Sequence, residues 1–214
     1  MVIKKRYSLS WSKPLAKTRP IEPVIRFIAI IAGAPDVEAW ATRQICHQWG
    51  ESVDKTEPFP FIAGGYYTAE MGPDLRKTLV ALGEPCDPGG LADWKVQTNA
   101  WEWEAAEEFR GGAARPLNLD PGYITQAKLV LATVKDRDHR LYLGKGIFGE
   151  VTLTYTAKRW IDHRWTYPDY RTPEVIEFAN RCRRRLRQHL KRVGGFRIAR
   201  KDSFLDRQRD PGPP

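Results

Sequence analysis

The stretch between residues 127 and 155 limits the fold most, because it holds three strand-forming runs joined by very short connections. The runs are AKLVLATVK at 127–135, HRLYL at 139–143 and IFGEVTLTY at 147–155. Parallel neighbours need a crossover of roughly a dozen residues or more, so connections as short as DRD and GKG predict an antiparallel meander. Polar and apolar side chains alternate along the third run, which places Glu150 and Leu153 on opposite faces of its strand.

The amino-terminal half predicts a strand, a helix and a second strand. The mostly apolar, β-branched run at 24–32 suits a buried strand, and Asp36 offers an N-cap for a helix that ends near Trp49. Aromatic and β-branched residues in FPFIAGGYYTAEMG indicate the second strand, in which Gly64 and Gly65 mark a bulge or a close backbone approach.

Residues 73–110 look largely helical, with a break in the EPCDPGG loop at 84–90. The second piece is rich in helix formers and carboxylates. We expect it to pack through one stripe of side chains, namely Leu91, Trp94, Thr98, Trp101 and Ala105.

The segment TPEVIEFANRCRRRLRQHLKR predicts a carboxy-terminal helix with Thr172 as N-cap, Pro173 at the first helical position and Gly194 beyond its end. Its expected buried stripe is Val175, Ala179, Cys182, Leu186, Leu190 and Val193. Together these elements predict an α+β fold, a mainly antiparallel sheet with helices packed on one face.

The 214 residues fit a single domain over residues 23–195. Residues 1–22 and the basic, proline-containing tail at 196–214 look like flexible extensions. Cys46, Cys86 and Cys182 are far apart and show no CxxC spacing, which argues against a disulfide framework or a zinc site and favours a cytoplasmic protein. The apolar run at 24–32 is too short to span a bilayer, so no membrane partner is expected.

The hexapeptide NLDPGY at 118–123 carries a strong turn signal. Pro121 disfavours helix at Asp120, and Gly122 can take the positive φ that a type II turn requires at its third position. We expect this turn to aim Asn118 and Asp120 from the end of the sheet into a cleft. The alternative is that Asp120 only hydrogen-bonds within its own turn.

Five segments, YYTAEMG (66–72), KVQTNAWE (95–102), NLDPGY, LATVKDRDHRLYLGKGIFGEVTL (131–153) and WTYPDY (165–170), resemble the bacterial domain-of-unknown-function family 4416. The resemblance spans residues 24–180 and implies no reaction. Members sometimes carry a GTP-binding label, which finds little support here because the sequence lacks a GxxxxGK[ST] phosphate loop. The resemblance draws attention to charged and amide groups: Glu70, Lys95, Asn99, Glu102, Asn118, Asp120, Lys135, His139, Arg140, Glu150 and Asp169.

These groups are costly to bury unpaired, so a shared polar cleft is one interpretation. In it Glu70, Asp120 and Glu150 would hold Mg²⁺ through oxygen ligands. The ligand-binding candidates for a phosphorylated small molecule or nucleotide are Lys95, Asn99, Asn118, Lys135 and Arg140. The competing interpretation is local pairing, with Glu150 opposite Arg140 and with Lys95 and Glu102 on a helix surface.

His139 is the best candidate for a general acid or base, because imidazole titrates near neutral pH. With Asp120 and Glu150 it completes the set of candidate catalytic residues. No HExxH or Ser-His-Asp order is present, which disfavours zinc hydrolysis and serine-type acyl transfer, and whether the protein is an enzyme stays open. The rings of WTYPDY either seal a core edge or stack on a base.

The net charge of +9 is concentrated in one segment, because residues 181–201 contain ten Lys or Arg and no Asp or Glu. Cations this dense favour a polyanion, and RNA or DNA is the polyanion we expect. The candidate nucleic-acid contacts are Arg183, Arg184, Arg187, Lys191 and Arg192. The alternative is a solvated helix face paired with the acidic segment WEWEAAEEF. The sequence therefore carries two hypotheses, a phosphate or nucleotide site in a cleft and a noncatalytic nucleic-acid-binding module.

Overall fold

The computed structural model describes residues 21–61 and 67–194. Most of the two predicted extensions lies outside these ranges, as do Gly64 and Gly65, for which a bulge was predicted. The predicted strand around them is represented by the short β3 and is followed by the one-turn helix α2. None of the described helices is long and apolar enough to cross a membrane.

The described residues form one antiparallel sheet and four α-helices, so the α+β prediction is confirmed. The helices are α1 (Pro35–Trp49), α2 (Thr68–Met71), α3 (Leu91–Glu108) and α4 (Pro173–Arg192). The strands are β1 (Ile25–Ala32), β2 (Ser52–Lys55), β3 (Phe59–Pro60), β4 (Arg76–Leu82), β5 (Leu117–Ile124), β6 (Lys128–Thr133), β7 (Leu141–Gly144), β8 (Ile147–Thr156) and β9 (Arg159–Asp162). Two 3₁₀ helices, η1 (Pro88–Gly90) and η2 (Pro168–Arg171), precede α3 and α4.

The sheet order is β2-β4-β1-β5-β6-β8-β7, with β3 beside β4 and β9 beside β8. Its first four strands, joined by α1 and α3, follow the β-α-β-β-α-β chain order and the strand arrangement of the ferredoxin-like, or split βαβ, unit. The strands β6, β8, β7 and β9 extend this unit beyond β5, and β3 adds to it beside β4. The junction between β5 and β6 therefore separates the two halves of the sheet.

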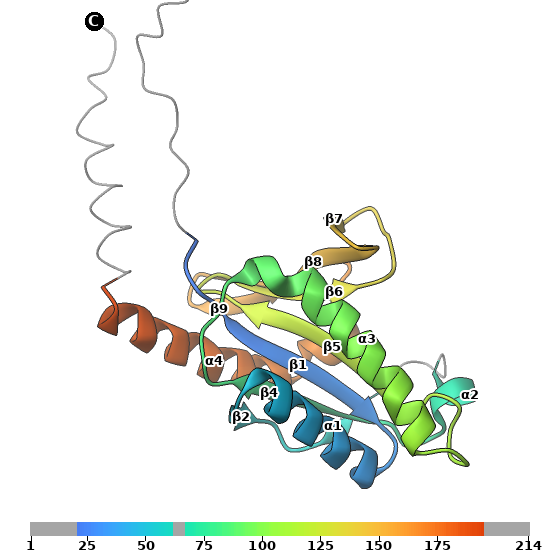
Figure 1. The fold of residues 1–214 in the computed structure, drawn as a ribbon. Coiled ribbons are helices and arrows are strands. Elements are labelled where there is room, and N and C mark those ends of the chain that lie inside the picture. Colours follow the sequence, from blue (N-terminus) through green and yellow to red (C-terminus); the bar gives the residue numbers. More distant parts are fainter. Residues whose placement is uncertain (1–20, 62–66, 195–214) are drawn as a thin grey trace, which may run out of the picture.

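Helices cover both faces of the sheet (Figure 1). Successive side chains of β1 point to opposite faces, so Phe27 packs in the cluster that contains α4 and Ile28 packs in the cluster that contains α1 and α3. The prediction that the helices share one face is wrong. The second face of the central strands is equally apolar, and it would stay exposed without α4.

The stripe predicted for α3 is confirmed, because all five of its members are buried. On α4 the predicted stripe is buried from Val175 to Leu190, and Phe178 joins it against Phe27. Val193 lies past the last helical residue and is exposed, so its inclusion was wrong.

The predicted turn at NLDPGY does not form, because residues 118–123 lie inside β5. β5 pairs with β1 along its whole length but with β6 only at residues 122–124. Pro121 has no N–H to donate to a neighbouring strand, and there the two strands separate. Glycine is required at position 122 because neighbouring atoms pack closely against it, and not because of a positive φ. A Cβ built on Gly122 would lie 2.4 Å from the Val130 carbonyl oxygen and 2.7 Å from Phe27 Cζ.

Residues 76–82, which were predicted to be helical, form β4. All but the first of them are buried, so no polar alternation distinguishes this strand from a buried helix. The meander is also wrong in its order, since β8 lies between β6 and β7. The β7–β8 hairpin turns at Lys145 and Gly146, both with positive φ.

A register shift in the β6–β8 pairing breaks the expected alternation of β8. Glu150 lies opposite Leu131 and Leu153 lies opposite Leu129, so Glu150 and Leu153 share a face. The strand β9 was not predicted. Its hairpin turns at Ala157 and Lys158, which have positive φ without the usual glycine or asparagine signal.

Candidate pocket between α3 and the separated strands

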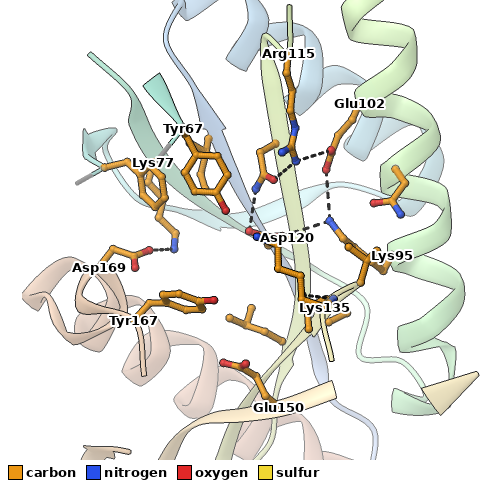
Figure 2. A pocket seen from close by; sticks show the side chains of 18 of the residues that line it. Tyr67, Lys77, Lys95, Glu102, Arg115, Asp120, Lys135, Glu150, Tyr167 and Asp169 are labelled. Atoms are coloured by element: carbon orange, nitrogen blue, oxygen red, sulfur yellow. Dashed lines mark hydrogen bonds and ion pairs between the residues drawn. The ribbon is translucent and has the colours of Figure 1, made fainter. Parts of the chain in front are cut away.

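A pocket of about 880 Å³ occupies the region where β5 and β6 separate. Its charged and amide side chains come from six parts of the chain: β4, α3, the segment from 114 to β5, the β6–β7 connection, β8 and η2 (Figure 2). The charged and amide side chains that line it are Lys77, Lys95, Asn99, Glu102, Arg115, Asn118, Asp120, Lys135, Arg137, Arg140, Glu150 and Asp169.

Helix α3 satisfies the backbone of β5 that β6 leaves unpaired. The Leu119 N–H donates to Glu102 Oε1 at 2.9 Å, and Lys95 Nζ donates to the Leu119 carbonyl oxygen at 2.6 Å. Lys95, which is buried, and Glu102, whose side chain is 12% exposed, are thus structural partners of a strand edge rather than residues on the exposed surface of a helix. A buried N–H or C=O without such a partner would cost roughly 1–3 kcal/mol.

A hydrogen-bonded chain joins α3 to the carboxylate at the centre of Figure 2. Arg115 donates to Glu102 Oε2 at 3.0 Å and to the Asn118 side-chain oxygen. Asn118 Nδ2 in turn donates to Asp120 Oδ2 at 2.9 Å, and Lys95 Nζ lies 3.3 Å from Asp120 Oδ1.

The pKa of Asp120 is lowered from its usual value. Burial opposes ionisation, but Lys95, Lys77 and the Asn118 amide together outweigh it. Asp120 therefore stays ionised at neutral pH, which fits a hydrogen-bond acceptor better than a general acid.

Lys77 and Asp169 form a buried ion pair at one side of the pocket, with Nζ 2.5 Å from Oδ2. The Lys77 ammonium also lies 3.4 Å from the centre of the Tyr170 ring. Burial lowers the pKa of Lys77 despite the opposing effect of Asp169.

Glu150 and Arg140 form a second buried pair, with Arg140 Nε 2.7 Å from Glu150 Oε2. The predicted local pairing of these two residues is confirmed. Arg140 also donates to the Lys135 carbonyl oxygen at 2.8 Å and to the Tyr167 hydroxyl at 3.3 Å. Thr152 donates to the other Glu150 oxygen, so the Glu150 carboxylate is well supplied with protein donors.

His139 lies outside the pocket lining and reaches it only through Glu150, whose Oε2 is 3.3 Å from His139 Nε2. Its ring stacks on Trp165, and His163 stacks on the same indole. A bound ligand would therefore meet Glu150 before His139.

Seven of the nine residues predicted for catalysis, ligand binding and metal binding in the cleft line the pocket: Lys95, Asn99, Asn118, Asp120, Lys135, Arg140 and Glu150. Glu70 does not line it, and its side chain is 64% exposed near Arg115. No group of three His, Cys, Asp or Glu side chains in the described part of the chain is arranged to hold a metal ion, so Glu70, Asp120 and Glu150 do not form the predicted set of Mg²⁺ ligands.

Sequence reasoning missed Lys77, Arg115, Arg137 and the exposed ring of Trp103, all of which line the pocket. For Lys77 a signal was present: a lysine followed by TLVAL is an unexpected charge in a buried run. Arg115 had no such signal, because its contacts come from residues three, thirteen and forty-five positions away.

The predicted nucleic-acid contacts lie on α4, away from the pocket lining. Arg183 donates to the Gln126 carbonyl oxygen and stacks on the Tyr155 ring, and Arg187 donates to the Gln126 side chain. The acidic segment of α3 lies on the opposite face of the sheet (Figure 1). The predicted pairing between these two helices is therefore absent.

A family model described as a domain of unknown function, DUF4416, matches residues 22–186. The chain belongs to this family. The match includes every element from β1 to the middle of α4, and the resemblance inferred from the sequence is confirmed. Searches of curated proteins and of solved structures gave no match.

Proposed function

We propose that this DUF4416 protein binds a phosphorylated small molecule or nucleotide in the pocket between α3 and the separated strands. One observation carries the proposal: the pocket lining has six cationic side chains against four carboxylates. The cations are Lys77, Lys95, Arg115, Lys135, Arg137 and Arg140, and the carboxylates are Glu102, Asp120, Glu150 and Asp169. An excess of positive charge in a concave site favours an anionic ligand.

The cations divide into two groups by their surroundings. Lys77, Lys95 and Arg140 are buried and bound to carboxylates, and Arg115, whose side chain is 34% exposed, is also bound to a carboxylate, that of Glu102. Lys135 and Arg137 are exposed on the β6–β7 connection. The second pair faces solvent at the pocket, so we assign the phosphate to this side.

Two exposed rings of the lining support the nucleotide alternative. Trp103 on α3 is 77% exposed, and Tyr167 before η2 is 49% exposed. Exposed aromatic faces stack on bases with little dependence on the base. A nucleotide would use both the cations and a ring, whereas a small phosphorylated metabolite would use the cations alone.

Mg²⁺ enters the proposal only as a companion of the ligand. In many phosphate sites Mg²⁺ takes one or two protein carboxylates and completes its coordination with phosphate oxygens. Asp120 is the most accessible carboxylate of the lining, but Lys95 already lies 3.3 Å from it. Binding is therefore expected without Mg²⁺, and addition of the ion tests its role.

A thermal-shift screen of the full chain against nucleotides and sugar phosphates, with and without Mg²⁺, tests the proposal. A ligand should raise the melting temperature of the wild type, and the double variant Lys135→Ala/Arg137→Ala should lose most of that rise. Arg43→Ala on α1, an exposed cation outside the pocket, is the matched control. An equal rise in all three proteins would reject the pocket as the binding site.

A second candidate function is RNA or DNA binding by α4. It is favoured by one observation: within the described residues, no carboxylate lies within ion-pair distance of Arg183, Arg184, Arg185, Lys191 or Arg192. Unneutralised cations on one helix attract a phosphate backbone. Fluorescence anisotropy with labelled RNA and DNA should show affinity that falls steeply with salt, and affinity independent of salt would reject this function.

A further inference from the structure

The four carboxylates that line the pocket differ in how far they face its open space. The side chains of Glu150, Asp169 and Glu102 are 2%, 9% and 12% exposed, whereas that of Asp120 is 34% exposed. The first three serve internal ion pairs. Asp120 is therefore the carboxylate that a ligand in the pocket can reach most easily.

Asp120 is also held in place and kept charged. Its strand pairs fully with β1, and Asn118 and Lys95 each contact one of its two oxygens. A carboxylate offers about four acceptor positions, so protein contacts leave room for ligand donors. The negative charge of Asp120 repels a phosphate group. A ligand group that donates a hydrogen bond is instead attracted to this carboxylate.

The hydroxyl of Tyr170 is a second polar group of the pocket, and it can donate a hydrogen bond. Tyr170 lines the same pocket, and its buried hydroxyl oxygen has no hydrogen-bond partner among the described residues. Burial and the nearby charges of Asp120, Asp169 and Glu150 raise the pKa of Tyr170 well above its usual value. The hydroxyl therefore keeps its proton and lacks an acceptor, which is an expensive state for a buried polar group.

We propose that the pocket binds, beside Asp120 and Tyr170, a hydroxyl group of a phosphorylated sugar or of the ribose of a nucleotide, which donates to Asp120 and accepts from Tyr170. This inference rests on the proposed function and narrows it to polyhydroxy phosphate compounds. An alcohol donates and accepts at once, whereas an ammonium group cannot accept and a phosphate dianion cannot donate. The exposed cations Lys135 and Arg137 supply the separate place for the phosphate.

Isothermal titration calorimetry with two matched ligand pairs tests the inference on the full chain. The pairs are glycerol 3-phosphate with n-propyl phosphate and AMP with 2′,3′-dideoxy-AMP, which differ only in hydroxyl groups. In at least one pair the wild type should bind the hydroxylated member about tenfold more tightly or better, since hydrogen bonds to a charged group are strong. Tyr170→Phe and Asp120→Asn should each reduce that ratio, and Tyr155→Phe, outside the pocket, should leave it unchanged.

Equal affinity for both members of each pair, with binding still weakened by Lys135→Ala/Arg137→Ala, would overturn the inference and leave the proposed function intact. Absence of binding by all four compounds would count against both. If Asp120→Asn does not fold, Tyr170→Phe alone decides, because it removes only the oxygen atom that has no partner.

Discussion

The pocket and the outer surface of α4 are both rich in cations, but they differ in what surrounds each charge. Lys77, Lys95 and Arg140 lie within reach of carboxylates that come from other elements, namely Asp169, Asp120 and Glu150. On α4, Arg184 and Lys191 are exposed and form no ion pair with any described carboxylate. Cations that pair with carboxylates from other elements have fixed positions and can form a specific binding site. Unpaired cations along one helix provide only a positively charged surface.

The comparison predicts that the buried pocket cations Lys77, Lys95 and Arg140 matter for folding and that the exposed α4 cations do not. The Lys77–Asp169 pair joins β4 to η2, the segment that leads into α4. This pair contributes to stability only while both partners are present, because a single buried charge is costly. Mutations of the buried pocket pair should therefore lower the free energy of unfolding, whereas mutations of the exposed α4 cations should hardly change it.

The largest effect is expected for Asp169→Ala, which leaves the Lys77 ammonium buried without its partner. We expect a loss of about 3–5 kcal/mol in the free energy of unfolding, measured by urea denaturation. The double variant Lys77→Met/Asp169→Ala should recover part of that loss, since it removes the unpaired charge. A loss below about 1 kcal/mol for Asp169→Ala would show that the pair is not buried in solution.

A smaller effect is expected for Glu102→Ala, which removes the acceptor of the Leu119 N–H and a partner of both Lys95 and Arg115. The free energy of unfolding should fall by about 1–3 kcal/mol. Glu104→Ala, at an exposed position one residue beyond Trp103 on the same helix, is the control and should change stability by less than about 0.5 kcal/mol. Equal effects of the two substitutions would contradict the role of Glu102 as a partner of the β5 backbone.

The helices with a clear periodic signal and the β-branched strand β1 were predictable from the sequence, whereas β4, which is also buried on both faces, was not. α3 and α4 show one apolar stripe each, and both stripes are confirmed up to Leu190. β4 is apolar on both faces and resembles a helix segment, so its assignment failed. At NLDPGY the local turn propensity was overridden, because all six of its residues are in register pairs with β1, which hold the segment extended.

The candidate site shows the same division between local and tertiary information. The family resemblance drew attention to Lys95, Asp120 and Arg140, and the cost of burying unpaired charges predicted that they share a polar cleft. The partners themselves depend on the separation of β5 from β6, which brings α3 against the strand edge. No local pattern in the sequence specifies that separation beyond Pro121, so the role of Arg115 was not predictable.

The pH dependence of stability sharpens the comparison further. Because the folded pKa of Asp120 lies below its unfolded value of about 3.9, its stabilising contribution is complete above that value and is lost as the pH falls through the folded pKa. Asp120→Asn should therefore flatten the acid limb of the stability curve below about pH 4, measured by urea denaturation at several pH values. Glu108→Gln, at an exposed position near the end of α3, should keep the wild-type acid limb. If the two variants show the same acid limb, the ammonium groups around Asp120 do not lower its pKa.

The smallest effect on folding is expected on α4, where the triple variant Arg184→Gln/Lys191→Gln/Arg192→Gln removes three cations that have no ion pair with a described carboxylate. Each exposed substitution should change the free energy of unfolding by less than about 0.5 kcal/mol, because it breaks no buried contact.

If α4 binds RNA or DNA, the slope of log affinity against log salt should fall by about one for each cation that contacts a phosphate. Arg181→Gln is the contrasting variant, because its guanidinium is engaged by Asp54 with contacts of 2.8–3.0 Å, so its loss should lower stability more than it changes the salt slope. A triple variant that unfolds easily but binds polyanion with an unchanged slope would reverse the distinction between the two regions.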